Sequence, residues 1–182
     1  LGFKAEICNS PSNLDEADKI ILPGVGSFSD AMKCLKEENW LPVINNHVAD
    51  KERPLLGICL GMQLLAEYGT EGGEVEGLGY IPGNVKHLEK LGCKQRIPHV
   101  GWNNVNIVEE NMLYSGISSG PEFYFVHSYA FNPSDKRNIS ATVTYTNEIV
   151  ASVQKNNIFG TQFHPEKSSK AGLRVLKNFL LI

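Results

Sequence analysis

Residues 54–62 constrain the fold more than any other part of this sequence, because a buried strand changes into a helix there within a single residue. Residues 54–58 form an apolar run of strand length, and residues 60–68, directly after Cys59, are a predicted helix. Gly57 and Gly61 stand two residues before and two residues after the cysteine. Glycines at these positions permit a strained turn that holds the cysteine side chain clear of the sheet. We therefore expect a βα unit with Cys59 at its turn.

The first third of the chain continues this alternation of short apolar runs with helix-length amphipathic segments. Residues 4–8 and 19–22 are predicted strands, and a Pro- and Gly-rich turn follows at 23–26. The apolar spacing after Phe28 predicts one or two helices, broken near Pro42. This order of elements is typical of βα units around a parallel sheet.

The rest of the chain has a different pattern. Residues 70–79 are rich in Gly and Glu and predict an exposed, mobile loop. From residue 80, β-branched and alternating runs predict antiparallel or mixed strands, and Ser168 begins a last helix. We predict an α/β fold: a single three-layer domain over residues 1–182, with helices flanking a mostly parallel, mixed central sheet.

Composition excludes several classes of protein. The 17 Lys and Arg residues against 20 Asp and Glu give a net charge of −3, so the chain lacks the basic footprint of a nucleic-acid-binding protein. No stretch approaches the ~20 apolar residues of a membrane span. The 4 cysteines are far apart, without a Cys-x-x-Cys pair, which argues against a zinc site and against a disulfide scaffold. We expect no metal, no cofactor and a reducing cytoplasm.

Cys59 has the setting of a nucleophile. A helix N-terminus beside it lowers a thiol pKa and presents free N–H groups, and the thiolate is the reactive form. A base for this thiol is available at the end of the predicted strand 158–163, where His164 and Glu166 follow two residues apart. In an extended chain these side chains point to one side, so the carboxylate could orient the imidazole. The competing interpretations are a merely buried cysteine and a solvated turn.

Three segments resemble the three signatures of class I, triad-type glutamine amidotransferases, and they occur in the same order. They are residues 23–28 (PGVGSF), 57–65 (GICLGMQLL) and 160–168 (GTQFHPEKS). Residues 98–103 (PHVGWN) and 124–129 (YFVHSY) are similar to one branch of that family, the glutaminase subunit of imidazole glycerol phosphate synthase. The resemblance covers essentially the whole chain. It places the family's opening strand and helix ahead of Leu1, and we expect this sequence to lack them.

The resemblance implies catalytic roles for individual residues. Cys59 matches the nucleophile, His164 the base and acid, and Glu166 the carboxylate that orients the histidine. The implied oxyanion hole combines the N–H of Leu60 with an N–H from a glycine-rich strand whose peptide reorients in the family. The residues of that strand are Gly24, Val25 and Gly26.

Two further sets of residues are implied by the resemblance. The positions that match glutamine-binding residues are Gln63, His127, Ser128 and Tyr129. The positions expected at a partner interface are His99, Val100, Trp102 and Asn103. Simpler interpretations remain open at this point: Gln63 as a partly buried helix residue, Tyr129 as core packing, and Trp102 as a core anchor.

The implied activity is hydrolysis of glutamine to glutamate by a Cys-His-Glu triad. The ammonia would pass to a (βα)8-barrel cyclase partner in a heterodimer, which makes imidazole glycerol phosphate in histidine biosynthesis. A paralogous glutaminase that serves another synthetase, such as a surface-sugar amidating enzyme, would show the same motifs. A Cys-dependent peptidase or hydrolase of related topology is a second alternative, against which Gln63 and the His-Ser-Tyr run argue. A non-catalytic binding module is disfavoured because all three triad residues are present.

Overall fold

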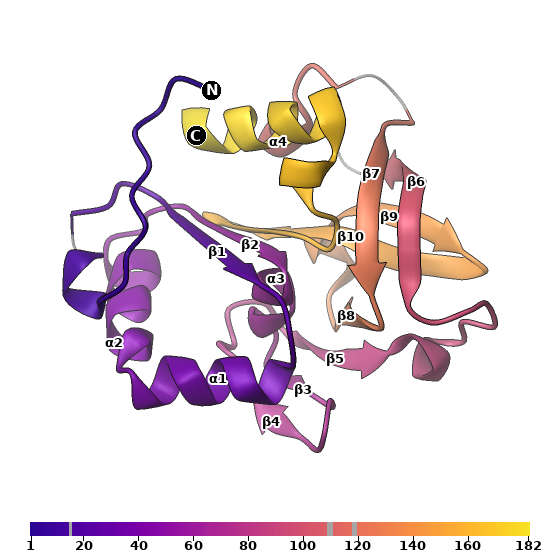
Figure 1. The fold of residues 1–182 in the computed structure, drawn as a ribbon, viewed down its shortest axis with the longest axis horizontal. Coiled ribbons are helices and arrows are strands. Elements are labelled where there is room, and N and C mark those ends of the chain that lie inside the picture. Colours follow the sequence, from indigo (N-terminus) through magenta and orange to yellow (C-terminus); the bar gives the residue numbers. More distant parts are fainter. Residues whose placement is uncertain (15, 109–110, 118–119) are drawn as a thin grey trace.

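Two sheets organise the chain in the computed structural model, which describes residues 1–14, 16–108, 111–117 and 120–182 (Figure 1). The larger sheet has seven strands in the order β1-β2-β11-β10-β9-β6-β7, and the smaller has four in the order β4-β3-β5-β8. The strands of the larger sheet are β1 Ile20–Gly24, β2 Leu55–Cys59, β6 His99–Ile107, β7 Glu122–His127, β9 Ile139–Tyr145, β10 Asn147–Lys155 and β11 Ile158–Thr161. Those of the smaller sheet are β3 Tyr68–Gly69, β4 Val75–Glu76, β5 Gly83–His87 and β8 Tyr129–Pro133.

The larger sheet is mixed, as predicted, but its parallel part is smaller than the prediction of a mostly parallel sheet. Parallel pairing joins β1 to β2 and β2 to β11. The pairs from β11 through β10, β9 and β6 to β7 are antiparallel, as the alternating runs after residue 80 predicted. Hairpin connections such as β9 to β10 explain the difference, since tight turns join only antiparallel neighbours.

Helices cover both faces of this sheet, and α4 lies on the face opposite α1, α2 and α3 (Figure 1). The helices are α1 Phe28–Glu37, α2 Trp40–Asn45, α3 Leu60–Leu64 and α4 Ser169–Leu181, and a π-helical segment, Asn46–Asp50, follows α2. Strand β2 is buried on both faces: Leu55 packs in the cluster of Phe28, and Leu56 packs in the cluster of Phe179. A continuous apolar run is the pattern expected of such a strand.

Three local predictions were wrong. Residues 4–8 form no strand and lie mostly exposed, because an apolar run becomes a strand only where a neighbour supplies hydrogen bonds. The helix predicted from 60 to 68 ends at Leu64, since the chain then turns into β3. The loop 70–79 contains β4, and Glu71 accepts a hydrogen bond of 2.8 Å from the backbone N–H of Phe28 at the start of α1.

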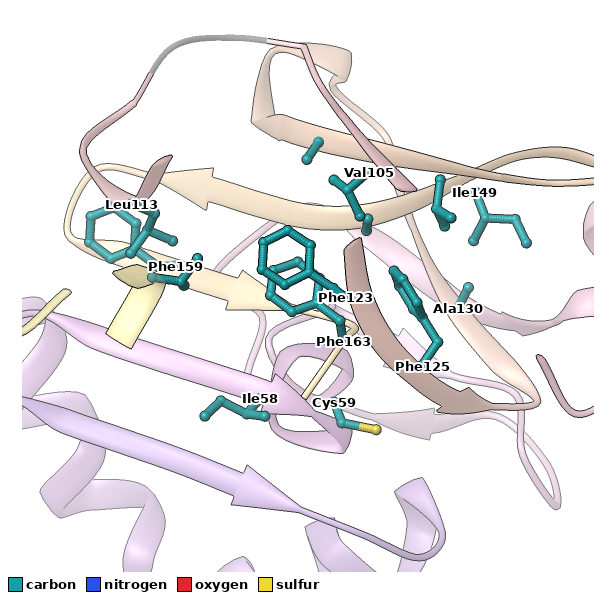
Figure 2. Packing of buried hydrophobic residues seen from close by; sticks show 14 of the residues in the cluster. Ile58, Cys59, Val105, Leu113, Phe123, Phe125, Ala130, Ile149, Phe159 and Phe163 are labelled. Carbon is teal, nitrogen blue, oxygen red and sulfur yellow. The ribbon is translucent and has the colours of Figure 1, made fainter. Parts of the chain in front are cut away.

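The larger sheet curls so strongly that its far edge, β7, returns to the carboxyl end of β11. The backbone N–H of His164, just beyond β11, donates to the carbonyl of Tyr124 on β7 at 2.9 Å. Ser168 ties the same place together, since its hydroxyl donates to His164 O and accepts from the N–H of Tyr124. Stacked aromatic rings of Phe123 and Phe163, 4.0 Å apart, fill the space inside the curl (Figure 2). The carboxyl ends of β2 and β11 therefore face β7.

Candidate active site

Cys59 occupies a strained turn between β2 and α3. Its backbone has φ 55° and ψ −108°, a region that side chains rarely adopt. The flanking glycines are sterically required: a Cβ on Gly57 would lie 2.5 Å from the carbonyl oxygen of Gly61, and a Cβ on Gly61 would overlap the carbonyl of Leu22. The predicted strained turn is therefore present, and it holds Cys59 at the end of β2, in the same buried cluster as Phe125 and Phe163 (Figure 2).

The Cys59 thiol is buried and neutral. Burial raises the pKa of the Cys59 thiol to about 11, and the charge of Glu166 raises it further, while the N–H of Leu60 and the amide of Gln162 lower it. The N–H of Leu60 at the start of α3 lowers the thiol pKa, as expected, but α3 has only 5 residues and burial outweighs this effect. This cysteine needs a base at the moment of attack.

His164 supplies a nitrogen suited to that task. It lies two residues beyond Gln162, and Gln162 follows Thr161, which pairs with Ile58 on β2. His164 is buried, with 4% of the residue's surface exposed, and its Nδ1 lies 2.7 Å from Oε1 of Glu166. Because a carboxylate only accepts, Nδ1 carries the proton and Nε2 is the acceptor. This buried Nε2 has no hydrogen-bond partner within the described ranges.

The predicted oxyanion strand lies beside the turn. Gly24 is the last residue of β1 and pairs with Cys59, and a Cβ on Gly24 would lie 3.0 Å from the Cβ of Leu60. Val25 is 82% exposed, and Gly26 has φ 108°, which a side chain would disfavour. The structure therefore brings this segment and the N–H of Leu60 to one end of the sheet.

The predicted glutamine-binding residues lie on α3 and where β7 passes into β8. Gln63 on α3 is buried, and its Nε2 donates to the carbonyl of Tyr129 at 2.8 Å and to Oε1 of Gln162 at 3.0 Å. His127 ends β7 and is buried, whereas Ser128 and Tyr129 are half-buried. The Cys59 sulfur lies 3.9 Å from the carbonyl of Val126, which precedes His127 on β7.

The residues predicted at a partner interface divide between two faces of β6. Val100 and Trp102 point outward, 55% and 49% exposed, beside the paired residues Val126 and Tyr124 of β7. We call these four residues the β6–β7 face. His99 points inward and is 1% exposed, so it lies behind this face and not on it. Strand alternation explains the split, since neighbouring residues face opposite sides.

His99 takes part in a buried hydrogen-bonded chain. Its Nδ1 lies 2.9 Å from Nε2 of His127, its Nε2 lies 2.9 Å from Nδ2 of half-buried Asn103, and Nδ1 of His127 lies 2.9 Å from the carbonyl of Tyr129. The carbonyl can only accept, so each histidine carries its proton on Nδ1 and Asn103 donates to His99. Burial lowers the pKa of His99 to about 4 and the pKa of His127 to about 3. Both rings are uncharged near neutral pH.

Comparison with known proteins decides the family. The sequence profile described as "Glutamine amidotransferase class-I" matches residues 1–182. The chain belongs to the class-I glutamine amidotransferase family. Within it, the chain is 46% identical over 176 residues to the imidazole glycerol phosphate synthase subunit HisH of Pelagibacter ubique, which covers 96% of this chain and 85% of the relative. It is 50% identical over 174 residues to subunit HisH 1 of Campylobacter jejuni strain 81-176, and this match covers 95% of this chain and 85% of the relative.

Solved structures share the fold of this amidotransferase. A crystal structure of a glutamine amidotransferase superposes with a TM-score of 0.74 at 18% identity, covering 98% of this chain and 87% of that one. A glutamine amidotransferase from Thermotoga maritima gives 0.63 at 19% identity, covering 98% of this chain and 67% of that one. The single α/β domain with a curled mixed sheet is thus the fold of these neighbours.

Residues that the motifs alone did not single out complete the site of this amidotransferase. Gln162 lies inside the third signature, and its Nε2 is 3.7 Å from the Cys59 sulfur. Val126 and Tyr124 form the β7 half of the β6–β7 face, and the period-two alternation of their own segment was the available signal. Within the described ranges, no group of three or more His, Cys, Asp or Glu side chains is placed to hold a metal ion. None of the described helices is long and apolar enough to cross a membrane.

Proposed function

We propose that this protein is the glutaminase subunit of an imidazole glycerol phosphate synthase, which hydrolyses glutamine to glutamate and supplies ammonia to a cyclase partner. One observation carries the chemistry: a buried thiol lies on a strained turn at the end of β2, and just beyond the end of the neighbouring β11 lies a histidine whose Nδ1 is bound by Glu166 and whose Nε2 has no partner among the described residues. Relatives named HisH at 46% and 50% identity support the pathway. The proposal treats residues 1–182 as one amidotransferase domain acting in a reducing cytoplasm, with 4 free cysteines.

The first step attaches the substrate to the enzyme. Nε2 of His164 takes the thiol proton as the Cys59 sulfur attacks the carboxamide carbon of glutamine, and Glu166 stabilises the imidazolium that forms. The proton then passes to the departing nitrogen, ammonia leaves, and a γ-glutamyl thioester remains on Cys59. Because the thiol starts neutral, with a pKa of about 11, proton transfer accompanies attack.

The second step releases glutamate. His164 takes a proton from water, the hydroxyl adds to the thioester carbon, and the C–S bond breaks with its electron pair returning to sulfur, which regains a proton. Both steps develop negative charge on the carbonyl oxygen. The N–H of Leu60 and an N–H of the Gly24–Gly26 strand are the proposed donors to that oxygen.

Recognition of the glutamine backbone is proposed for Gln63, His127, Ser128 and Tyr129. The geometry restricts how two of them act. Both N–H bonds of the Gln63 amide are already donated to protein oxygens, so its contribution to a ligand is its own oxygen. His127 uses Nδ1 for Tyr129 and Nε2 for His99, so it shapes the pocket through its ring.

The partner is proposed to be a (βα)8-barrel cyclase, bound as a heterodimer over the β6–β7 face. Val100, Trp102 and Val126 expose apolar surface on two paired strands, and the carbonyl of Val126 contacts the Cys59 sulfur. A partner seated here covers the site from which ammonia leaves. Enclosure matters because ammonia in water near neutral pH is mostly ammonium, which is not nucleophilic.

The test compares Cys59→Ala with Cys34→Ala, a control at an exposed cysteine, in the full chain assembled with the cyclase. Cys59→Ala should abolish glutamine-dependent product formation and leave ammonium-dependent formation intact, and Cys34→Ala should leave both intact. Loss of glutamine use in Cys34→Ala but not in Cys59→Ala would overturn the assignment. Stimulation of glutaminase activity by another synthetase, and not by the cyclase, would identify the paralogous function instead.

A further inference from the structure

Gln162 is a fully buried side chain whose contacts leave its amide only one orientation. The carbonyl of Tyr129 accepts from Nδ1 of His127 at 2.9 Å and from Nε2 of Gln63 at 2.8 Å. Since a carbonyl cannot donate, Gln63 must present its nitrogen there. The second hydrogen of that nitrogen points to Gln162, whose oxygen must therefore be the acceptor, at 3.0 Å. The nitrogen of Gln162 therefore faces the Cys59 sulfur, at 3.7 Å.

The opposite orientation of Gln162 is excluded by the same contacts. Turning the amide over would set its two hydrogens against those of Gln63 and would aim an oxygen at the sulfur. Gln162 has no exposed surface, so water cannot repair either mismatch. An N–H donor is thus aimed permanently at the reacting atom by a chain that begins at the Tyr129 carbonyl.

The groups around the Cys59 sulfur differ in whether they favour the thiol or the thiolate. The carbonyl of Val126, 3.9 Å away, suits a thiol that donates its proton and opposes a thiolate. The side chain of Gln162 and the N–H of Leu60 do the reverse, since they favour the charged form of Cys59. Gln162 is therefore placed to act in the two moments when sulfur carries negative charge, which are attack and thioester cleavage.

We propose that Gln162 is a catalytic residue that donates a hydrogen bond to the Cys59 sulfur as it becomes negatively charged, and that Gln63 is the positioning residue that fixes the Gln162 amide. In the attack, the thiol proton leaves for His164 and the Gln162 N–H stabilises the electron pair left on sulfur. In deacylation, the same N–H stabilises the sulfur as the C–S bond breaks. The catalytic role rests on the proposed glutaminase function, whereas the effect on the thiol does not.

The experiment measures the reactivity of the thiol itself. The full chain is treated with iodoacetamide between pH 7.5 and 9.5, and alkylation of Cys59 and of exposed Cys34 is followed by peptide mass, with Cys34 as the internal reference. Only the thiolate reacts, and below the thiol pKa the thiolate fraction falls tenfold for each unit by which that pKa rises, which outweighs the accompanying gain in nucleophilicity. Gln162→Glu exchanges the N–H donor for an oxygen while still accepting from Gln63, and Gln162→Leu removes both contacts.

Both variants should slow Cys59 alkylation relative to Cys34 by about tenfold or more. Gln63→Leu should slow it by less, because the donor is then loosened and not removed. Gln154→Leu, on neighbouring β10, is the control for loss of a glutamine amide and should not change the ratio. Should Gln162→Glu fail to fold, Gln162→Leu decides the outcome.

Unchanged alkylation in folded Gln162→Leu would overturn the inference. Glutaminase kinetics with the partner separate it from the proposed function. Gln162→Leu should lower kcat for glutamine at least as much as it slows alkylation, with a smaller change in KM. If Gln162→Leu slows alkylation of Cys59 but the wild-type protein hydrolyses no glutamine, the contact is supported and the proposed function is refuted. If the wild type is an active glutaminase and Gln162→Leu has normal alkylation and normal kcat, the proposed function is supported and the role of Gln162 is refuted.

Discussion

Mild acid should unfold this protein because its buried histidine chain cannot accept a proton. His99 and His127 donate from Nδ1 and accept at Nε2, from Asn103 and His99 respectively, so each ring nitrogen is already used. Phe125 and Tyr145 stack on the two sides of His99, at 4.8 and 4.1 Å between ring centroids, and exclude water from it. A proton added to either ring would break a hydrogen bond and leave a buried charge.

The magnitude follows from the difference between the folded and unfolded pKa values. Burial lowers the pKa of His99 from 6.5 to about 4 and the pKa of His127 from 6.5 to about 3. A lowered folded pKa means that the unfolded chain binds more protons between these values, so stability is complete above pH 6.5 and falls as the pH falls. Each histidine lowers the free energy of unfolding by ~1.4 kcal/mol per pH unit below about 6.5. The pair should therefore lower it by about 3 kcal/mol at pH 5.5 and by about 5 kcal/mol at pH 4.5. Buried His47, whose pKa burial also lowers, adds to the loss.

The assay is urea unfolding of the full chain, followed by circular dichroism at half-unit steps from pH 7.5 to 4.5. His99→Gln and His99→Phe are compared with the wild type. Glutamine keeps a hydrogen-bonding side chain and phenylalanine keeps an aromatic ring, but neither titrates. Their stabilities at pH 7.5 should differ, whereas both should lose ~1.4 kcal/mol per pH unit less than the wild type below pH 6. Wild-type stability that is flat from pH 6.5 to 5, or a slope unchanged in both variants, would refute the reasoning.

Three further predictions concern the turn, the triad and the β6–β7 face. Gly61→Ala should lower the free energy of unfolding by about 3 kcal/mol or more, because its Cβ would overlap the Leu22 carbonyl. The control, Gly92→Ala, lies in open space at φ 88° and should cost only ~1 kcal/mol of backbone strain. Equal losses for the two variants in urea melts would contradict this prediction. His164→Ala should lower kcat for glutamine on the order of 10³-fold or more, and Glu166→Gln should lower it less because its role is orientation; steady-state kinetics with the partner would show the reverse order if the roles were misassigned. Trp102→Ala should weaken partner binding by about 2 kcal/mol in calorimetry and leave the Tm of the isolated chain unchanged. The control, Met112→Ala at an exposed position, should bind the partner normally. Unfolding of Trp102→Ala on its own would make Trp102 a core residue.

The local parts of the site could be predicted from the sequence because neighbouring residues determine them. The Cys59 turn needs Gly57 and Gly61 within two residues on either side, and the structure places a backbone contact at each. The contact between His164 and Glu166 likewise depends on two positions in a short extended segment. Such features follow from sterics and chain geometry over a few residues, and the residue pattern carries them.

The direction in which each β6 side chain faces could not be predicted in this way. His99 and Trp102 both lie in an alternating run with large rings, and nothing in the pattern distinguishes the ring that faces inward from the one that faces outward. The pairing of β6 with β7 decides it, since this pairing places His99 against His127 and Trp102 against Tyr124. The sheet prediction was limited for the same reason, because pairing partners far apart in the chain are chosen by packing.

The sequence by itself determined the strained turn, the histidine and carboxylate pair, and the alternation of βα units, since each depends on spacing within a few residues. Only the tertiary structure decided what surrounds the sulfur. The curl of the sheet brings β7 back to the ends of β2 and β11, so that residues 67 positions apart, Cys59 and Val126, come into contact. Closure of that curl also buries Gln63, Gln162 and His127 together, where the loss of water forces each polar atom to find a partner. Burial of the whole cluster, and not the helix end beside it, makes the thiol neutral.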